Sequence, residues 1–110
     1  WLAFSYQQLA YKYKEDPEYN KLALKFYEEI IQNYPERIED YKFYIETLLD
    51  KLRITENNED RKNLLNKIKK LIDKLRSLPN FTDPYDEIKE LNLTRIKLLN
   101  ALEPYSPKDC

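Results

Sequence analysis

The chain contains no glycine among its 110 residues, and this absence constrains the fold more than any other feature of the sequence. Glycine is the usual residue wherever a turn needs a positive φ, and average usage of about 7% would predict several. Valine, a residue that favours strands, is also absent. A helical chain can manage without both if its turns use Asn, Asp and Pro. We therefore expect an all-α protein, although an AT-rich coding sequence would also give a bias towards Ile, Lys, Asn, Tyr and Phe.

Prolines and Asn/Asp clusters divide the sequence into helical segments. The residue before a proline is displaced from the α region, so KEDPEY and NYPE each mark a helix boundary. Asp16 can cap a helix whose first residue is Pro17, and Thr82 or Asp83 can cap another. The pattern predicts about five helices in antiparallel pairs, at approximately 1–14, 16–33, 36–54, 59–77 and 84–103.

The apolar residues of these segments recur at helical spacing. Helix 59–77 carries a near-heptad seam, which comprises Leu64, Leu65, Ile68, Leu71, Ile72, Leu75 and Leu78. The apolar residues of helix 84–103 cover more than half of its surface, and such a helix needs neighbours on two sides. Either the fold continues beyond residue 110, or this helix contacts a partner.

The first two segments carry the spacing of a known repeat. Tyr6, Leu9, Ala10 and Tyr13 match aromatic–x–x–Leu–small–x–x–Tyr, and Ala23, Tyr27, Ile30 and Pro35 match the second helix of the same unit. In this respect the chain resembles the tetratricopeptide-repeat superfamily, which implies a right-handed helical-repeat stack. Small residues allow the two helices to approach closely, and the aromatic side chains fill the space beside them.

The match has departures. Ile30 replaces a small residue, and Pro35 and Pro79 are 44 residues apart, against about 34 in the standard repeat. We therefore expect one helical-repeat domain or fragment with a first repeat at 1–35, a long degenerate second repeat at 36–79 and a terminal helix at 84–103. Trp1, Phe4 and Gln8 also resemble the half-a-tetratricopeptide pattern of RNA-processing scaffolds. An unrelated amphipathic helical bundle remains the alternative.

The composition argues against catalysis and against bound cofactors. The chain has no His, and its one Cys is Cys110. No nucleophile–base pair can be assembled from these residue types, and no Gly-rich loop can hold a phosphate. The chain lacks the His residues and the pair of Cys residues that a metal site would use, and the TENNED segment lacks the glycine of a calcium loop. We expect no enzyme activity, no cofactor and no metal.

The charges are unevenly distributed although their sum is only −1. Between Glu15 and Asp60 there are 13 acidic and six basic residues, whereas between Arg61 and Arg76 there are seven basic residues and one acidic residue. Three lysines fall at i, i+3 and i+7 on the fourth helix, away from its Leu/Ile seam: Lys67, Lys70 and Lys74. We expect them either to bind an acidic segment of a partner or to pair with the neighbouring acidic helix. The balanced total charge argues against a nucleic-acid partner.

Aromatic side chains outside the repeat pattern suggest a second binding surface. In a tetratricopeptide-like stack the first helices of successive repeats line a concave groove, where exposed aromatic residues can anchor a peptide. The residues expected to line this groove are Phe4, Gln7, Gln8, Tyr11, Phe43 and Thr47. The alternative is that a flanking helix of a longer protein covers them.

The sequence thus predicts a non-catalytic scaffold that binds a protein or peptide partner. One alternative is a structural piece of a larger, RNA-processing or other, multi-subunit assembly, and another is a designed helical-repeat protein. No apolar run approaches the ~18 residues that span a bilayer, and a single Cys110 fits a reducing compartment or an engineered attachment point. We expect an intracellular location without a membrane partner. Because the first residue is Trp1, we also expect a fragment, a processed product or a shortened version.

Overall fold

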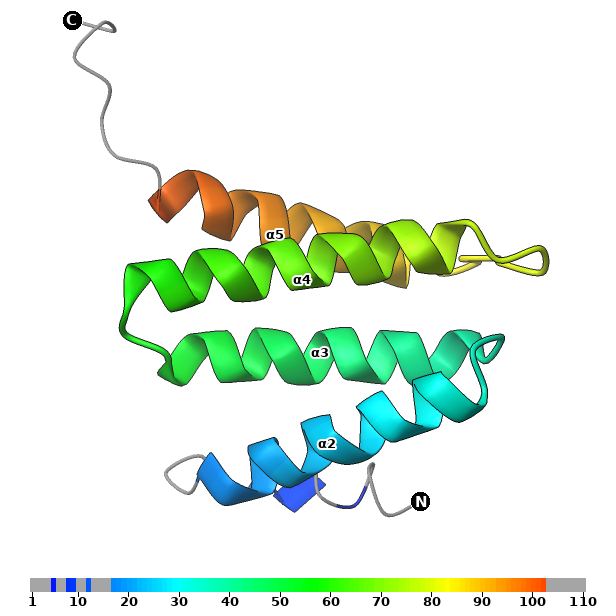
Figure 1. Cartoon of the computed structure of the whole chain (residues 1–110). Coiled ribbons are helices and arrows are strands. Elements are labelled where there is room, and N and C mark those ends of the chain that lie inside the picture. Colours follow the sequence, from blue (N-terminus) through cyan, green and yellow to red (C-terminus); the bar gives the residue numbers. More distant parts are fainter. Residues whose placement is uncertain (1–4, 6–7, 10–11, 13–16, 103–110) are drawn as a thin grey trace, which may run out of the picture.

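The computed structural model describes residues 17–102 together with Ser5, Gln8, Leu9 and Lys12. Within residues 17–102 the chain forms four successive helices: α2 (Pro17–Asn33), α3 (Ile38–Ile54), α4 (Asn58–Arg76) and α5 (Glu87–Leu102). Sequential helices pack as adjacent antiparallel neighbours (Figure 1), and no strand occurs among the described residues. The all-α prediction is therefore confirmed. The four described single residues are helical, and the rest of the expected helix 1–14 lies outside the described residues.

The helix boundaries follow the local signals closely for α2, α3 and α4. Pro17 is the first residue of α2, as its fixed φ favours. Asn57 caps α4 by accepting a hydrogen bond from the Asp60 backbone N–H at 3.0 Å. Tyr34, Pro35, Glu36 and Arg37 separate α2 from α3. These turns use Pro and Asn in place of glycine.

Helix α5 begins three residues later than the sequence pattern predicts. Asp83 does cap it, since its two carboxylate oxygens accept from the backbone N–H groups of Ile88 and Lys89 at 3.2 and 3.1 Å. Between the cap and the helix the chain makes a turn, closed by the Asp86 N–H donating to the Asp83 carbonyl at 3.0 Å. Asp86 has φ of 54°, a left-handed conformation that Asp tolerates better than most residues. This turn takes the place of the expected first helical turn.

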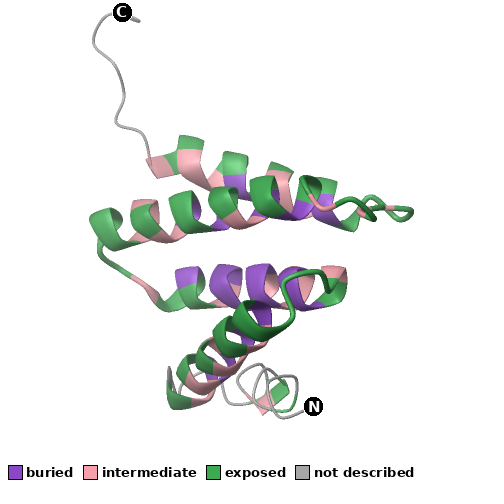
Figure 2. Ribbon diagram, turned by 45° about the vertical axis from the view of Figure 1, so that its right-hand side comes forward, coloured by how far each residue is buried: buried purple, intermediate pink, exposed green. Residues whose placement is uncertain are grey.

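Helix α3 lies at the centre of the described fold. It contacts α2, α4 and α5, whereas α2 contacts neither α4 nor α5. Because of this central position, apolar side chains on several sides of α3 are buried (Figure 2). The buried apolar residues of α3 are Tyr41, Tyr44, Ile45, Leu48, Leu49 and Leu52.

The neighbouring helices contribute the residues that the spacing predicted. Ala23 is fully buried and Tyr27 nearly so, and the Tyr27 ring stacks on that of Tyr44 at a centroid distance of 6.4 Å. Leu65, Ile68, Ile72 and Leu75 form the buried face of α4. The core roles assigned to these residues are confirmed. Within the described residues, no helix combines the length and apolar character that crossing a bilayer requires.

Candidate functional site

Lys67, Lys70 and Lys74 form an exposed row on α4, which we call the lysine row. The buried side of the same helix carries Leu65 and Ile68, so the row faces solvent as the spacing predicted. None of the three ammonium groups forms an ion pair with the residues that the structure describes. The ion pairs with a neighbouring acidic helix, which were the expected alternative, are therefore absent from the described part of the chain.

A nearby lysine shows the contrast. Lys69 lies outside the row and pairs with Asp73 at 3.1 Å within α4. Both side chains are more than half exposed, so this pair contributes little to stability. Lys69 nevertheless has a local partner for its charge, and the lysine row has none among the described residues.

Lys67 also touches the core. Its ammonium nitrogen lies 5.4 Å from the centre of the Tyr44 ring, a cation–π contact across the α3–α4 seam. Tyr44 is buried, so the lysine stem covers the edge of an apolar cluster while its charge stays at the surface. The contact holds the Lys67 charge at the junction of the two helices.

A pocket of about 410 Å³ opens at this junction. Its lining comes from the end of α3 and the first half of α4: Lys51, Thr55, Asp60, Asn63, Leu64 and Lys67. We call it the α3–α4 pocket. It contains two lysines against one carboxylate, and neither Lys51 nor Lys67 has an ion-pair partner among the described residues. The pocket is thus a net positive surface with a half-buried leucine in it.

Hydrogen bonds at the turn between α3 and α4 fix the rim of this pocket. The Arg61 Nη1 donates to the backbone carbonyls of Leu52 and Thr55 at 3.2 and 3.0 Å. The Thr55 hydroxyl donates to the Lys51 carbonyl at 2.8 Å. Carbonyl groups of the last turn of a helix have no intrahelical partner. Here a guanidinium from the next helix bonds to the Leu52 carbonyl of that turn and to the carbonyl of the cap residue Thr55. We call this arrangement the Arg61 clamp.

The groove residues expected from the repeat pattern are only partly described. Phe4, Gln7 and Tyr11 lie outside the described residues, and Gln8 is exposed. Phe43 is half-buried rather than free, and its ring stacks on Tyr27 at 6.4 Å.

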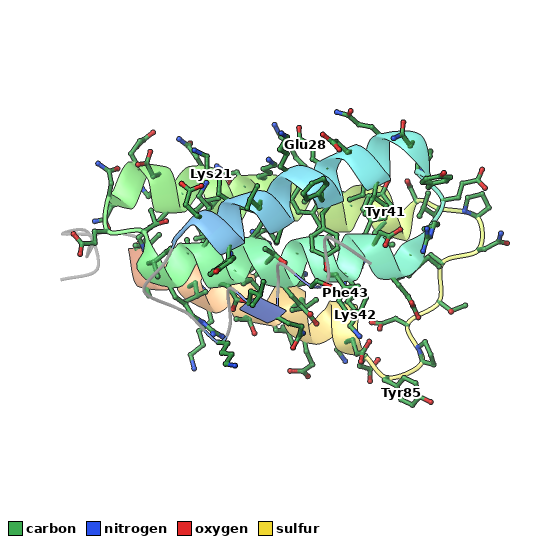
Figure 3. All side chains as sticks on the ribbon, turned by 90° about the horizontal axis from the view of Figure 1, so that it is seen from below. Lys21, Glu28, Tyr41, Lys42, Phe43 and Tyr85 are labelled. Carbon is green, nitrogen blue, oxygen red and sulfur yellow. The ribbon has the colours of Figure 1, made fainter. Side chains whose placement is uncertain are left out.

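Lys42 lies beside Phe43 on α3 (Figure 3), with its ammonium nitrogen 5.4 Å from the ring centre. Lys42 also pairs with Glu87 of α5 at 2.6 Å, and this hydrogen bond raises the pKa of Lys42. These contacts involve Phe43 in the packing of α2 and of α5 against α3.

The expectation for Thr47 is corrected. Its side chain was expected beside an exposed groove, but it is 0% exposed. The hydroxyl donates to the Phe43 carbonyl four residues earlier at 2.7 Å, and the Thr47 carbonyl accepts from the Asn20 side chain at 3.1 Å. A hydroxyl that is satisfied within its own helix can be buried at little cost. Thr47 therefore joins α2 to α3 and cannot contact a partner.

Apart from Lys42, the described groups whose pKa is shifted are buried. Burial raises the pKa of Tyr27 and of Tyr41, and the Tyr41 hydroxyl donates to the Pro35 carbonyl at 3.1 Å. Burial also raises the pKa of Asp40, although Arg37 opposes this effect. Arg37 Nε lies 3.1 Å from Asp40 Oδ2 without a well-directed hydrogen bond, so the contact is an ion pair only. Among the described residues, no group of three His, Cys, Asp or Glu side chains could hold a metal ion.

Two exposed surfaces lie away from the α3–α4 pocket. On α5, Leu93 is 49% exposed and Ile96, one turn later, is also exposed. Tyr85, in the loop before α5, is 83% exposed and points away from the helices (Figure 3).

Comparisons with protein-family models, with curated proteins and with solved structures found no match.

Proposed function

We propose that the chain is a non-catalytic interaction scaffold that binds a partner protein or peptide at the lysine row. The observation that carries this proposal is the row itself: three ammonium groups on one face of α4, exposed and without an ion-pair partner in the described residues. Like charges one turn apart on a helix repel one another by a few tenths of a kcal/mol, approximately. An acidic partner would remove this repulsion.

The fold proposed for the scaffold is a right-handed tetratricopeptide-like stack. Two features support it. Helix α5 contacts α3 as well as α4, while α2 does not reach α4, an alternation that a stack of helix pairs produces. The small residue Ala23 and the aromatic residue Tyr27 are both buried at positions where the repeat places packing residues.

Selection from a random peptide library displayed on phage tests the proposal. We expect the immobilised chain to enrich peptides rich in Asp and Glu. The variant K67Q/K70Q/K74Q should bind the enriched peptides at least about threefold more weakly, since each exposed charge pair contributes about 0.2–1 kcal/mol. The salt dependence of binding should also become shallower in this variant, because fewer charges remain for the salt to screen.

The matched control is K69Q/K89Q/K97Q, which removes three exposed lysines that lie outside the row. It changes the net charge by the same amount. Equal weakening in both variants would show that only the total charge matters. A pool without acidic enrichment would remove the lysine row from the proposal.

The exposed apolar residues of α5 favour a second candidate, a structural piece of a larger assembly. Leu93 and Ile96 form a surface that a neighbouring subunit could cover. Sedimentation velocity separates the two candidates: a monomer that enriches acidic peptides is a scaffold, whereas self-association abolished by L93S/I96S indicates an assembly surface.

A further inference from the structure

We infer that the α3–α4 pocket is the specificity site of the scaffold and that it takes a peptide segment in which acidic side chains flank one aliphatic side chain. This inference rests on the proposed function and names the chemistry of its partner. The pocket brings together Lys51 from α3 and Lys67 from α4, which are 16 positions apart in sequence.

The charge in the pocket favours carboxylates. Lys51 and Lys67 are exposed and have no ion-pair partner among the described residues, so a partner carboxylate does not have to displace an existing ion pair. The carbonyl end of α3, which would repel an anion, already receives two hydrogen bonds from the Arg61 guanidinium. The positive charge of the two lysines is therefore opposed mainly by Asp60.

The apolar part of the lining favours an aliphatic side chain between the carboxylates. Leu64 lines the pocket and is only half-buried, so part of its surface is free to be covered. The pocket volume of about 410 Å³ lies within the range of about 300–1,000 Å³ found for ligand sites. Acidic residues that extend beyond the pocket along α4 would meet Lys70 and Lys74.

A nucleic acid fits this surface less well than a peptide. The chain carries a net charge of −1, and the exposed carboxylates of Glu28 and Glu29 lie on α2. A phosphate backbone needs a broader basic surface than one row of lysines.

The test is a titration of the full ¹⁵N-labelled chain with the capped peptide Ser-Glu-Leu-Glu-Ser, followed by NMR. We expect saturable shifts in the amide signals of Thr55, Asn63 and Leu64. K51Q and K67Q should each weaken binding about two- to fivefold, and D60N should strengthen it about twofold because it removes the opposing charge. A peptide with Ser in place of Leu should bind more weakly, and one with Gln in place of both Glu should bind about four- to 25-fold more weakly.

K69Q is the matched control, since it removes a lysine of the same helix that lies outside the pocket and has its own carboxylate partner. If K51Q and K67Q weaken binding no more than K69Q does, the pocket inference is wrong. If K70Q and K74Q weaken binding while K51Q does not, the scaffold proposal stands and the pocket is not its specificity site. Tighter binding of a ten-nucleotide oligothymidylate than of the peptide would also overturn the inference. Absence of any saturable shift would overturn the pocket inference, whereas the phage selection decides the scaffold proposal separately.

Discussion

Replacement of Arg61 by Met should destabilise the protein by about 1–2 kcal/mol. Methionine keeps an unbranched apolar stem but removes both hydrogen bonds of the Arg61 clamp. The Leu52 carbonyl would retain a donor, because the Thr55 backbone N–H also bonds to it at 3.2 Å. The Thr55 carbonyl would lose the donor that Arg61 supplies. Hydrogen bonds to charged groups contribute about 1.5–3 kcal/mol each, so the upper limit for losing both would be about 3–6 kcal/mol.

Two features of the site reduce this magnitude. Arg61 is only half-buried, so water can replace part of what is lost. Its Nε is buried without a hydrogen-bond partner among the described residues, and methionine removes that unfavourable group. The net loss should therefore lie nearer to the contribution of one good hydrogen bond than of two.

Urea denaturation followed by circular dichroism measures the effect. With a typical slope of about 1.5 kcal/mol per molar urea, the midpoint should fall by about 1 M. The control is R53M, because Arg53 is largely exposed and pairs with Asp50 at 3.2 Å within one helix. Such a surface pair contributes about 0.5 kcal/mol or less. If R61M shifts the midpoint no further than R53M, the Arg61 clamp does not stabilise the α3–α4 turn.

Two other substitutions test the core and its buried charge. I68A should cost about 2–5 kcal/mol in the same urea assay, since Ile68 is fully buried and its removal leaves a cavity; a loss below about 1 kcal/mol would mean that α4 is not packed as described. D40N should change how the free energy of unfolding depends on pH. Burial raises the folded-state pKa of Asp40 above its unfolded value, so the wild-type protein loses stability as pH rises through the folded pKa. The stability of D40N relative to wild type should therefore be greater at pH 7 than at pH 3.5, and parallel stability curves would contradict this account.

The sequence was sufficient for the features that depend on local spacing. Helix α2 begins at Pro17 and ends at Asn33, where the proline and asparagine signals lie. The period of the Leu/Ile seam identified the buried side of α4. Ala23 and Tyr27 were assigned to the core for the same reason. These features need only helical periodicity and capping chemistry.

Features that depend on side-chain hydrogen bonds, on the packing of one helix against another or on an unusual backbone conformation were missed. Thr47 was placed beside the groove because the resemblance to a tetratricopeptide repeat puts helix 36–54 along it. Its side chain is instead buried, and a bond from its hydroxyl to the Phe43 carbonyl satisfies it within the helix. Arg95 is buried, and its Nε donates to the Asn92 side chain at 3.0 Å, although a charged residue type alone suggests an exposed position. The α3–α4 pocket gave no signal because Lys51 and Lys67 meet only when the two helices pack. The left-handed conformation of Asp86 was also not predicted, because the spacing of apolar residues carries no information about φ at a turn.

The order of the helices has a consequence for how the protein reaches its folded state. Apart from the contact between α3 and α5, every pair of contacting described helices is consecutive in the chain. Contacts between near neighbours in sequence close short loops, and chains rich in them fold in about microseconds to milliseconds. Helix α3 can pack on α2 before α4 and α5 have formed. The described helices can therefore assemble in the order in which a ribosome synthesises them, with each new helix docking on the one before it.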